Sequence, residues 1–173
     1  MIRRMYASDR DPVLRILHST KMFTPAELDL ATEQIDIYLS CTKQSDYSIV
    51  VLEGEDFEVK GYMSFGPTPL TQYIYNLYWI AISPKTQNQG HGRELITWLE
   101  KSVRSVSGRM ILAETSSKLQ YKPTRAFYLD LGFKEISRIP DFYGPGDDRI
   151  TYIKKLIKRA PKKYGYLAEN FEA

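Results

Sequence analysis

The stretch from Tyr73 to Gly92, YIYNLYWIAISPKTQNQGHG, decides the fold. Its first half, up to Ile82, is rich in Tyr, Ile and Trp, which are residue types that favour β-strands. Pro84 ends that strand, because proline has no N–H group to donate to a sheet. The second half is polar, contains two glycines and leads into an amphipathic segment that continues to about residue 107. The stretch therefore predicts a long strand, a tight turn and a helix.

The turn, Gln87-Asn88-Gln89-Gly90-His91-Gly92-Arg93, has the features of an anion site. Glycine lacks a Cβ and tolerates positive φ, so the main chain can approach a ligand closely. The free N–H groups and the dipole at a helix N-terminus attract phosphate. An ordinary strand-to-helix turn has similar glycine spacing, and the spacing alone leaves that alternative open. The endings of a nucleotide P-loop and of a dinucleotide fingerprint are both missing, which excludes those two classes.

Strand-like and helix-like segments surround this stretch. Strands are predicted at residues 1–6, 47–53, 58–65, 110–113, 133–139 and 149–156, and helices at 9–19, 24–39 and 124–131. Thr24 and Glu27 form a capping box at the start of the second helix. The resulting order, βααβββαβαββ, predicts an α+β protein with one sheet and helices on both faces.

Composition excludes several classes of protein. The chain has 173 residues, 24 Lys plus Arg and 21 Asp plus Glu, a net charge of +3 that is too small to predict nucleic-acid binding. The basic run at residues 154–163 is interpreted as a solvated segment. Cys41 is the single cysteine, and His18 and His91 form no ligand cluster with it, so no metal is expected. No window holds about 18 apolar residues, so we expect a cytoplasmic protein with no membrane segment.

Two motifs carry a family resemblance. The run Ile80-Ala81-Ile82-Ser83-Pro84, followed by Gln87-x-x-Gly90-x-Gly92 and Leu95, resembles the acetyl-CoA signature of the GNAT superfamily of N-acetyltransferases. The block AFYLDLGF at residues 126–133 is similar to the Phe-Tyr-x-x-x-Gly-Phe segment of that family. The resemblance covers residues 1–157 by element order and is specific over residues 78–135.

The resemblance implies a GNAT-like fold, in which a single mixed, mostly antiparallel sheet opens into a V-shaped cleft between two central strands. Those strands are the ones at residues 73–82 and 110–114. The GNAT-like domain would span residues 1–157. Residues 158–173 would form a C-terminal tail that packs on the domain or in an oligomer interface.

Acetyl-CoA is the co-substrate that the resemblance implies. Main-chain groups of Ile80 and Ile82 would pair with the pantetheine arm, as an added strand does. The N–H groups of residues 89–93 would hold the pyrophosphate. The full cofactor-binding set is Ile80, Ala81, Ile82, Gln87, Asn88, Gln89, Gly90, His91, Gly92 and Arg93.

The resemblance also identifies two candidate catalytic residues. Tyr128 occupies the position of the family's tyrosine and would protonate the leaving thiolate; its alternative is a core residue beside Phe127. Glu114 is expected to end a strand at the cleft mouth and to act as base, directly or through water; its alternatives are a surface carboxylate and a helix-cap partner. Trp79 and Tyr143 are candidate acceptor-site residues.

One position departs from the family pattern. Many relatives carry an asparagine seven residues before the tyrosine, in contact with the cofactor, whereas this chain has Tyr121 there. Lys122 and Arg125 are alternative phosphate ligands in that segment.

The sequence thus predicts an enzyme, an acyltransferase of the GNAT type that transfers acetyl from acetyl-CoA to an amine of a small molecule, peptide or protein. The competing interpretation is a non-catalytic CoA-binding module that regulates or senses. We also expect a homodimer, with no nucleic-acid partner.

Overall fold

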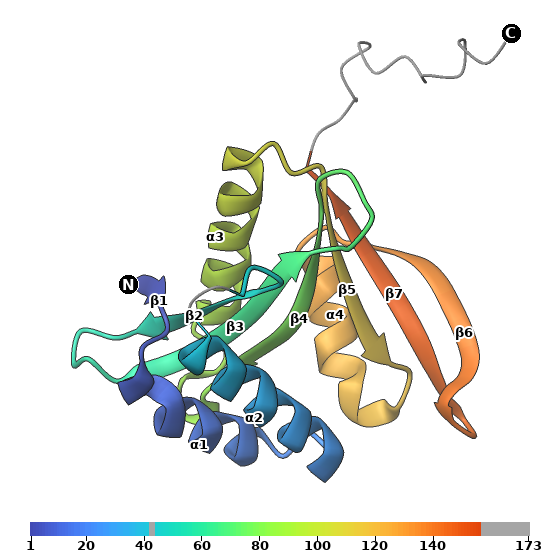
Figure 1. Ribbon diagram of the computed structural model, residues 1–173. Helices are drawn as coiled ribbons and strands as arrows, with labels where there is room; N and C mark the ends of the chain where they lie inside the picture. The colour runs from blue at the N-terminus through green and yellow to red at the C-terminus, as the bar shows by residue number, and fades with distance from the viewer. Residues whose placement is uncertain (42–43, 157–173) are drawn as a thin grey trace, which may run out of the picture.

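The computed structural model describes residues 1–41 and 44–156, which form one seven-stranded sheet and four α-helices (Figure 1). The strands are β1 Ile2–Arg4, β2 Ser48–Glu53, β3 Val59–Pro67, β4 Ile74–Ile82, β5 Met110–Ser116, β6 Lys134–Gly144 and β7 Asp147–Lys155. The α-helices are α1 Arg10–Thr20, α2 Pro25–Ser40, α3 His91–Ser105 and α4 Lys122–Asp130. The predicted order of elements is confirmed.

Helices cover both faces of the sheet, as predicted. One buried cluster joins α3 and α4 to the sheet, and a second joins α1 and α2 to the opposite face. Strand β2 shows the alternation that separates them: Val50 and Leu52 belong to the first cluster, and Ile49 and Val51 to the second. Successive side chains of a strand point to opposite faces, so one strand contributes to both cores.

The sheet has the order β1-β2-β3-β4-β5-β7-β6, and among these described strands the only parallel pair is β4 with β5. That pairing is short, since it joins Ile74–Leu77 to Met110–Ala113 and then stops. The register of β4 against β3 shifts at the same point: Leu77 lies opposite Phe65, while Trp79 lies opposite Ser64. Tyr78 is therefore the extra residue of a β-bulge, a feature that bends a strand. Beyond the bulge β4 and β5 diverge (Figure 1).

Several predicted boundaries move. The sequence suggested that Glu114 ends its strand. Strand β5 instead continues to Ser116, so Glu114 lies within it. Pairing of Glu114 with Thr151 of β7 extends β5 beyond its apolar run. The capping box of α2 is confirmed, since the side chain of Thr24 accepts from the Glu27 N–H and the Glu27 carboxylate accepts from the Thr24 N–H.

The edges of the sheet are the three-residue β1 and the eleven-residue β6. Pro140 removes one main-chain donor from the edge strand β6, because proline has no N–H group. The homodimer stays a prediction. The tail at residues 158–173 lies outside the described residues.

Candidate active site

The turn before α3 exposes main-chain amides. Asn88 and Gly90 both adopt the left-handed conformation, with φ of 62° and 88°, and α3 begins at His91. Within the described chain, no main-chain amide of residues 87–93 donates to a main-chain carbonyl; the first amide after them that does is that of Glu94, 3.0 Å from Gly90 O. The preceding amides are left at the N-terminus of a 15-residue helix, where backbone N–H groups attract anions.

The two glycines of the turn have different roles. A Cβ built on Gly90 has no atom within 4 Å, so the space beside it is open. A Cβ on Gly92 would lie 3.0 and 3.1 Å from two ring carbons of Phe127 in α4. Gly92 therefore permits close packing of α4 against the start of α3, in addition to the ligand approach that the sequence suggested for both glycines.

Beyond its bulge, β4 has a main-chain edge that pairs with no described strand. The amide of Ser83 donates to Lys60 O of β3 at 2.8 Å, so by alternation the main-chain groups of Ile80 and Ile82 point away from β3. The carbonyl of Ile82 accepts from Gln87 Nε2 at 3.2 Å, which ties the turn to this edge. Ala81, the residue between, turns its main-chain groups toward β3 and its side chain into the second core.

Tyr128 lies in the first core and is only 4% exposed. Its ring packs against Phe127, Phe133 and Tyr152, with centroid distances of 5.7, 5.4 and 5.7 Å. Burial raises the pKa of Tyr128 well above its usual range. The phenol consequently stays protonated at neutral pH, so it has a proton to donate.

Glu114 is exposed and points from the opposite face of the sheet. Its Oε1 accepts from Thr151 Oγ1 at 3.1 Å and lies 3.6 Å from Arg149 Nε. Its strand neighbour Ala113 is buried in the same cluster as Tyr128. Because neighbouring residues of a strand alternate in direction, Glu114 faces the side covered by α1 and α2.

The two candidate catalytic side chains thus approach the β4–β5 divergence from different sides. Tyr128 is on the α3–α4 face together with the side chains of Ile80 and Ile82. Glu114 is on the α1–α2 face, where Trp79 also packs. A group bound between the diverging strands would have a proton donor on one side and a carboxylate on the other.

Of the two candidate acceptor-site residues, Trp79 lies on the Glu114 side. Trp79 is partly buried and packs edge-on against Phe23, with centroids 5.6 Å apart. Tyr143 is 51% exposed. Burial and the charge of Glu114 raise the pKa of the Tyr143 phenol.

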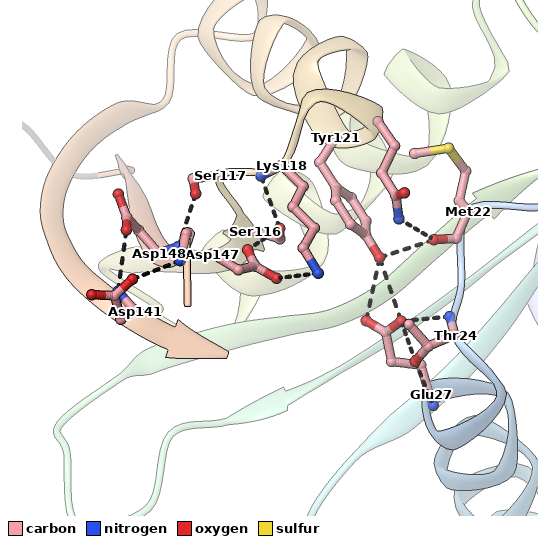
Figure 2. A network of polar contacts seen from close by, with 12 residues as sticks. Met22, Thr24, Glu27, Ser116, Ser117, Lys118, Tyr121, Asp141, Asp147 and Asp148 are labelled. Atoms are coloured by element: carbon pink, nitrogen blue, oxygen red, sulfur yellow. Dashed lines mark hydrogen bonds and ion pairs between the residues drawn. The ribbon is translucent and has the colours of Figure 1, made fainter. Parts of the chain in front are cut away.

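The connection from β5 to α4 is held by polar contacts that the sequence did not predict (Figure 2). Asp147 is 5% exposed, is in hydrogen-bond contact with Ser116 Oγ and lies 3.2 Å from Lys118 Nζ. Burial opposes ionisation of Asp147, but Ser116 and Lys118 outweigh it and hold the pKa of its carboxyl below the usual range. Asp147 is therefore a structural anion.

Arg125 also holds the connection from β5 to α4 in place. Its Nη1 donates to the carbonyls of Ser116 and Lys118 at 2.8 and 2.9 Å, so it fixes the loop before α4. Its neighbour Tyr121 contacts Met22 and Glu27, about a hundred residues earlier in the chain. No local pattern signals contacts over that separation.

Comparison with known proteins identifies the family. The acetyltransferase (GNAT) domain matches residues 45–135, which include β4, the glycine turn and α4. A solved structure from Desulfovibrio desulfuricans, assigned to the GNAT family, is 39% identical, covers 91% of this chain and 99% of its own, and has a TM-score of 0.86. The chain belongs to the GNAT acetyltransferase family. This GNAT protein is accordingly an acyltransferase.

More distant GNAT structures share the fold. An aminoglycoside 6'-N-acetyltransferase complexed with coenzyme A is 17% identical, with 93% of this chain and 99% of that one covered and a TM-score of 0.72. A ribosomal-protein alanine N-acetyltransferase from Escherichia coli is 18% identical, with coverages of 95% and 99% and a TM-score of 0.73. No curated protein matches the sequence of this GNAT chain.

Two further findings concern the described residues of this GNAT protein. None of its described helices is both long and apolar enough to cross a membrane. Residues 1–41 and 44–156 contain no group of three or more His, Cys, Asp or Glu side chains arranged to hold a metal ion.

Proposed function

We propose that the chain is an N-acetyltransferase that transfers the acetyl group of acetyl-CoA to a primary amine. One observation carries the proposal: the pairing of β4 with β5 stops next to Glu114, and it leaves the main-chain edge of β4 at Ile80 and Ile82 without a partner among the described strands, in the strand that precedes the N-terminus of α3. The relative complexed with coenzyme A supports the choice of cofactor. The relatives that act on an aminoglycoside and on a ribosomal protein support an amine acceptor.

Two parts of acetyl-CoA, the pyrophosphate and the pantetheine arm, have matching groups in the proposed site. Amides at the start of α3 would hold the pyrophosphate, and the open space beside Gly90 leaves room for it. The free edge at Ile80 and Ile82 would pair with the amides of the pantetheine arm. Bound along this edge, the thioester would lie at the divergence, between Tyr128 and Glu114.

The reaction needs two proton transfers, and the two faces of the sheet would each supply one. The neutral amine nitrogen attacks the thioester carbon, a C–N bond forms, and the C–S bond breaks. Tyr128 would donate its proton to the departing sulfur, since burial keeps that phenol protonated. Glu114, directly or through water, would accept the proton that the amine loses.

A transfer assay tests the proposal. Purified protein is incubated with acetyl-CoA and panels of small amines and peptides, while free thiol and acetylated product are both measured. We expect thiol release that depends on the amine and matches product in a one-to-one ratio. Binding of acetyl-CoA with no thiol release for any amine would instead favour the non-catalytic CoA-binding module.

A further inference from the structure

The connection between α1 and α2, residues 21–24, contacts both sides of the divergence at the bulge. One side is β4, called here the β4 limb; the other is β5 with the segment that leads into α4, called the β5–α4 limb. On the β4 limb, the ring of Phe23 packs edge-on against Trp79. On the β5–α4 limb, the carbonyl of Met22 accepts from Tyr121 Oη at 2.9 Å and from Gln120 Nε2 at 3.3 Å (Figure 2). Two adjacent residues of one connection therefore link β4 to the segment that follows β5. We call the contact between Tyr121 Oη and Met22 O the Tyr121 bridge.

Both ends of the Tyr121 bridge are held in place. Tyr121 Oη also lies 3.4 and 3.5 Å from the two carboxylate oxygens of Glu27, which caps α2 through Thr24. Burial and the charge of Glu27 raise the pKa of Tyr121, so the phenol stays protonated and can donate. The Arg125 contacts described above fix the loop that precedes Tyr121. The bridge is therefore a contact between two braced segments.

The bridge lies beside the proposed acceptor face. Trp79, which anchors one end of the connection, and Glu114 are on the same side of the sheet. The segment that carries Tyr121 directly follows β5, the strand that carries Glu114. The connection that the bridge holds down therefore lies on the same face of the sheet as Glu114.

We propose that Tyr121 determines acceptor specificity: its bridge to Met22 narrows the approach to Glu114, so the enzyme accepts slender, unbranched primary amines and rejects bulky ring amines. This inference rests on the proposed acetyl transfer. It also gives position 121 a role on the acceptor side. In many relatives the residue at this position is an asparagine that contacts the cofactor. A bulky amine could enter only by breaking the hydrogen bond and displacing the connection.

The test compares two amines in three proteins. Wild type, Tyr121→Phe and Tyr47→Phe are each assayed with n-butylamine and with a tricyclic amine, 1-adamantylmethylamine. Tyr47→Phe is the matched control, because it removes a phenol that donates to a main-chain carbonyl, Gln34 O at 3.0 Å, without linking the two limbs. We expect Tyr121→Phe to raise the ratio of kcat/KM for the tricyclic amine to that for butylamine by about tenfold. The KM for acetyl-CoA should not change.

Three outcomes would overturn the inference. One is an unchanged ratio in Tyr121→Phe. Another is a loss with both amines together with a raised KM for acetyl-CoA, which would return Tyr121 to the cofactor. The third is a wild-type enzyme that prefers the tricyclic amine.

A second measurement does not depend on turnover. Amide hydrogen exchange at residues 21–24 should be faster in Tyr121→Phe than in wild type, and unaltered there in Tyr47→Phe. Unaltered exchange in Tyr121→Phe would contradict the bridge. Failure of acetyl transfer to every amine would contradict the proposed function, and the exchange result would still decide whether the bridge holds the connection.

Discussion

The glycine turn and the Tyr121 bridge both lie at connections between elements, yet they are built in opposite ways. The turn is contiguous, covers residues 87–93 and offers main-chain amides at the start of α3. The bridge joins two segments that are 99 residues apart and depends on one side-chain hydroxyl. A site built from main-chain amides tolerates side-chain substitution at most of its positions. The Tyr121 bridge, in contrast, is lost when the single hydroxyl oxygen of Tyr121 is removed. The proposed cofactor and acceptor sites should therefore respond differently to substitution.

The largest effect is expected at Tyr128, the proposed proton donor, which belongs to neither region. Tyr128→Phe retains the buried ring but removes the proton donor, so turnover should fall by ~10²-fold for every amine. Affinity for acetyl-CoA should stay close to that of wild type, because Tyr128→Phe changes neither the main-chain amides of the turn nor the main-chain edge of β4. Single-turnover kinetics would measure the chemical step. Wild-type turnover in this variant would show that water or the acceptor supplies the proton.

A smaller effect should separate the turn from the acceptor side. Gly90→Asn keeps a residue type that tolerates the left-handed conformation but places a side chain in the open space beside the turn. We expect acetyl-CoA to bind about tenfold more weakly, a difference of about 1.4 kcal/mol, with an unaltered preference among amines. Isothermal titration with acetyl-CoA would measure the change.

Gly132→Asn is the matched control for that variant. Gly132 has φ of 82°, and a Cβ there would meet only the end of Lys154 at 3.9 Å. This control carries a similar conformational cost at the end of α4, away from the turn. Equal loss of acetyl-CoA affinity in both variants would mean that backbone strain, and not obstruction of the turn, causes the effect.

The smallest effect is expected for Glu114→Gln, and it should depend on pH. An alkylamine with a pKa of about 10.4 is neutral in only about one molecule in 2,500 at pH 7, so help with deprotonation matters most at low pH. Turnover of the variant should fall several-fold at pH 6 to 7 and recover above the pKa of the amine, where the neutral form is abundant. Acetyl-CoA affinity should not change. A uniform loss at all pH values would assign Glu114 to binding of the acceptor.

The sequence predicted the elements and the turn because their signals are local. The apolar run before Ser83, the glycines at 90 and 92 and the capping box at Thr24 each act over a few residues. The prediction that Glu114 ends its strand was wrong, because cross-strand pairing with Thr151 extends β5 after its hydrophobic pattern has stopped. Strand length there is set by a partner about forty residues away.

Side-chain contacts over long separations could not be predicted. Phosphate binding was one interpretation of Arg125, but the structure shows its guanidinium holding two carbonyls of the β5–α4 loop. The burial of Asp147 beside Ser116 was equally hidden, since the residues around it form a polar turn. Such contacts depend on the meeting of segments that only the finished fold brings together.

The bulge at Tyr78 opens the proposed site without contributing to the packing of either core. Before it, the odd-numbered residues Tyr75 and Leu77 face the α3–α4 core; after it, the even-numbered Ile80 and Ile82 do. Removal of Tyr78 would join these two patterns into uninterrupted alternation, with every apolar side chain still on its present face. It would also take away the bend that ends the pairing of β4 with β5. A deletion of one residue could thus yield a well-packed protein whose central strands run closed, so that stability survives while catalysis is lost.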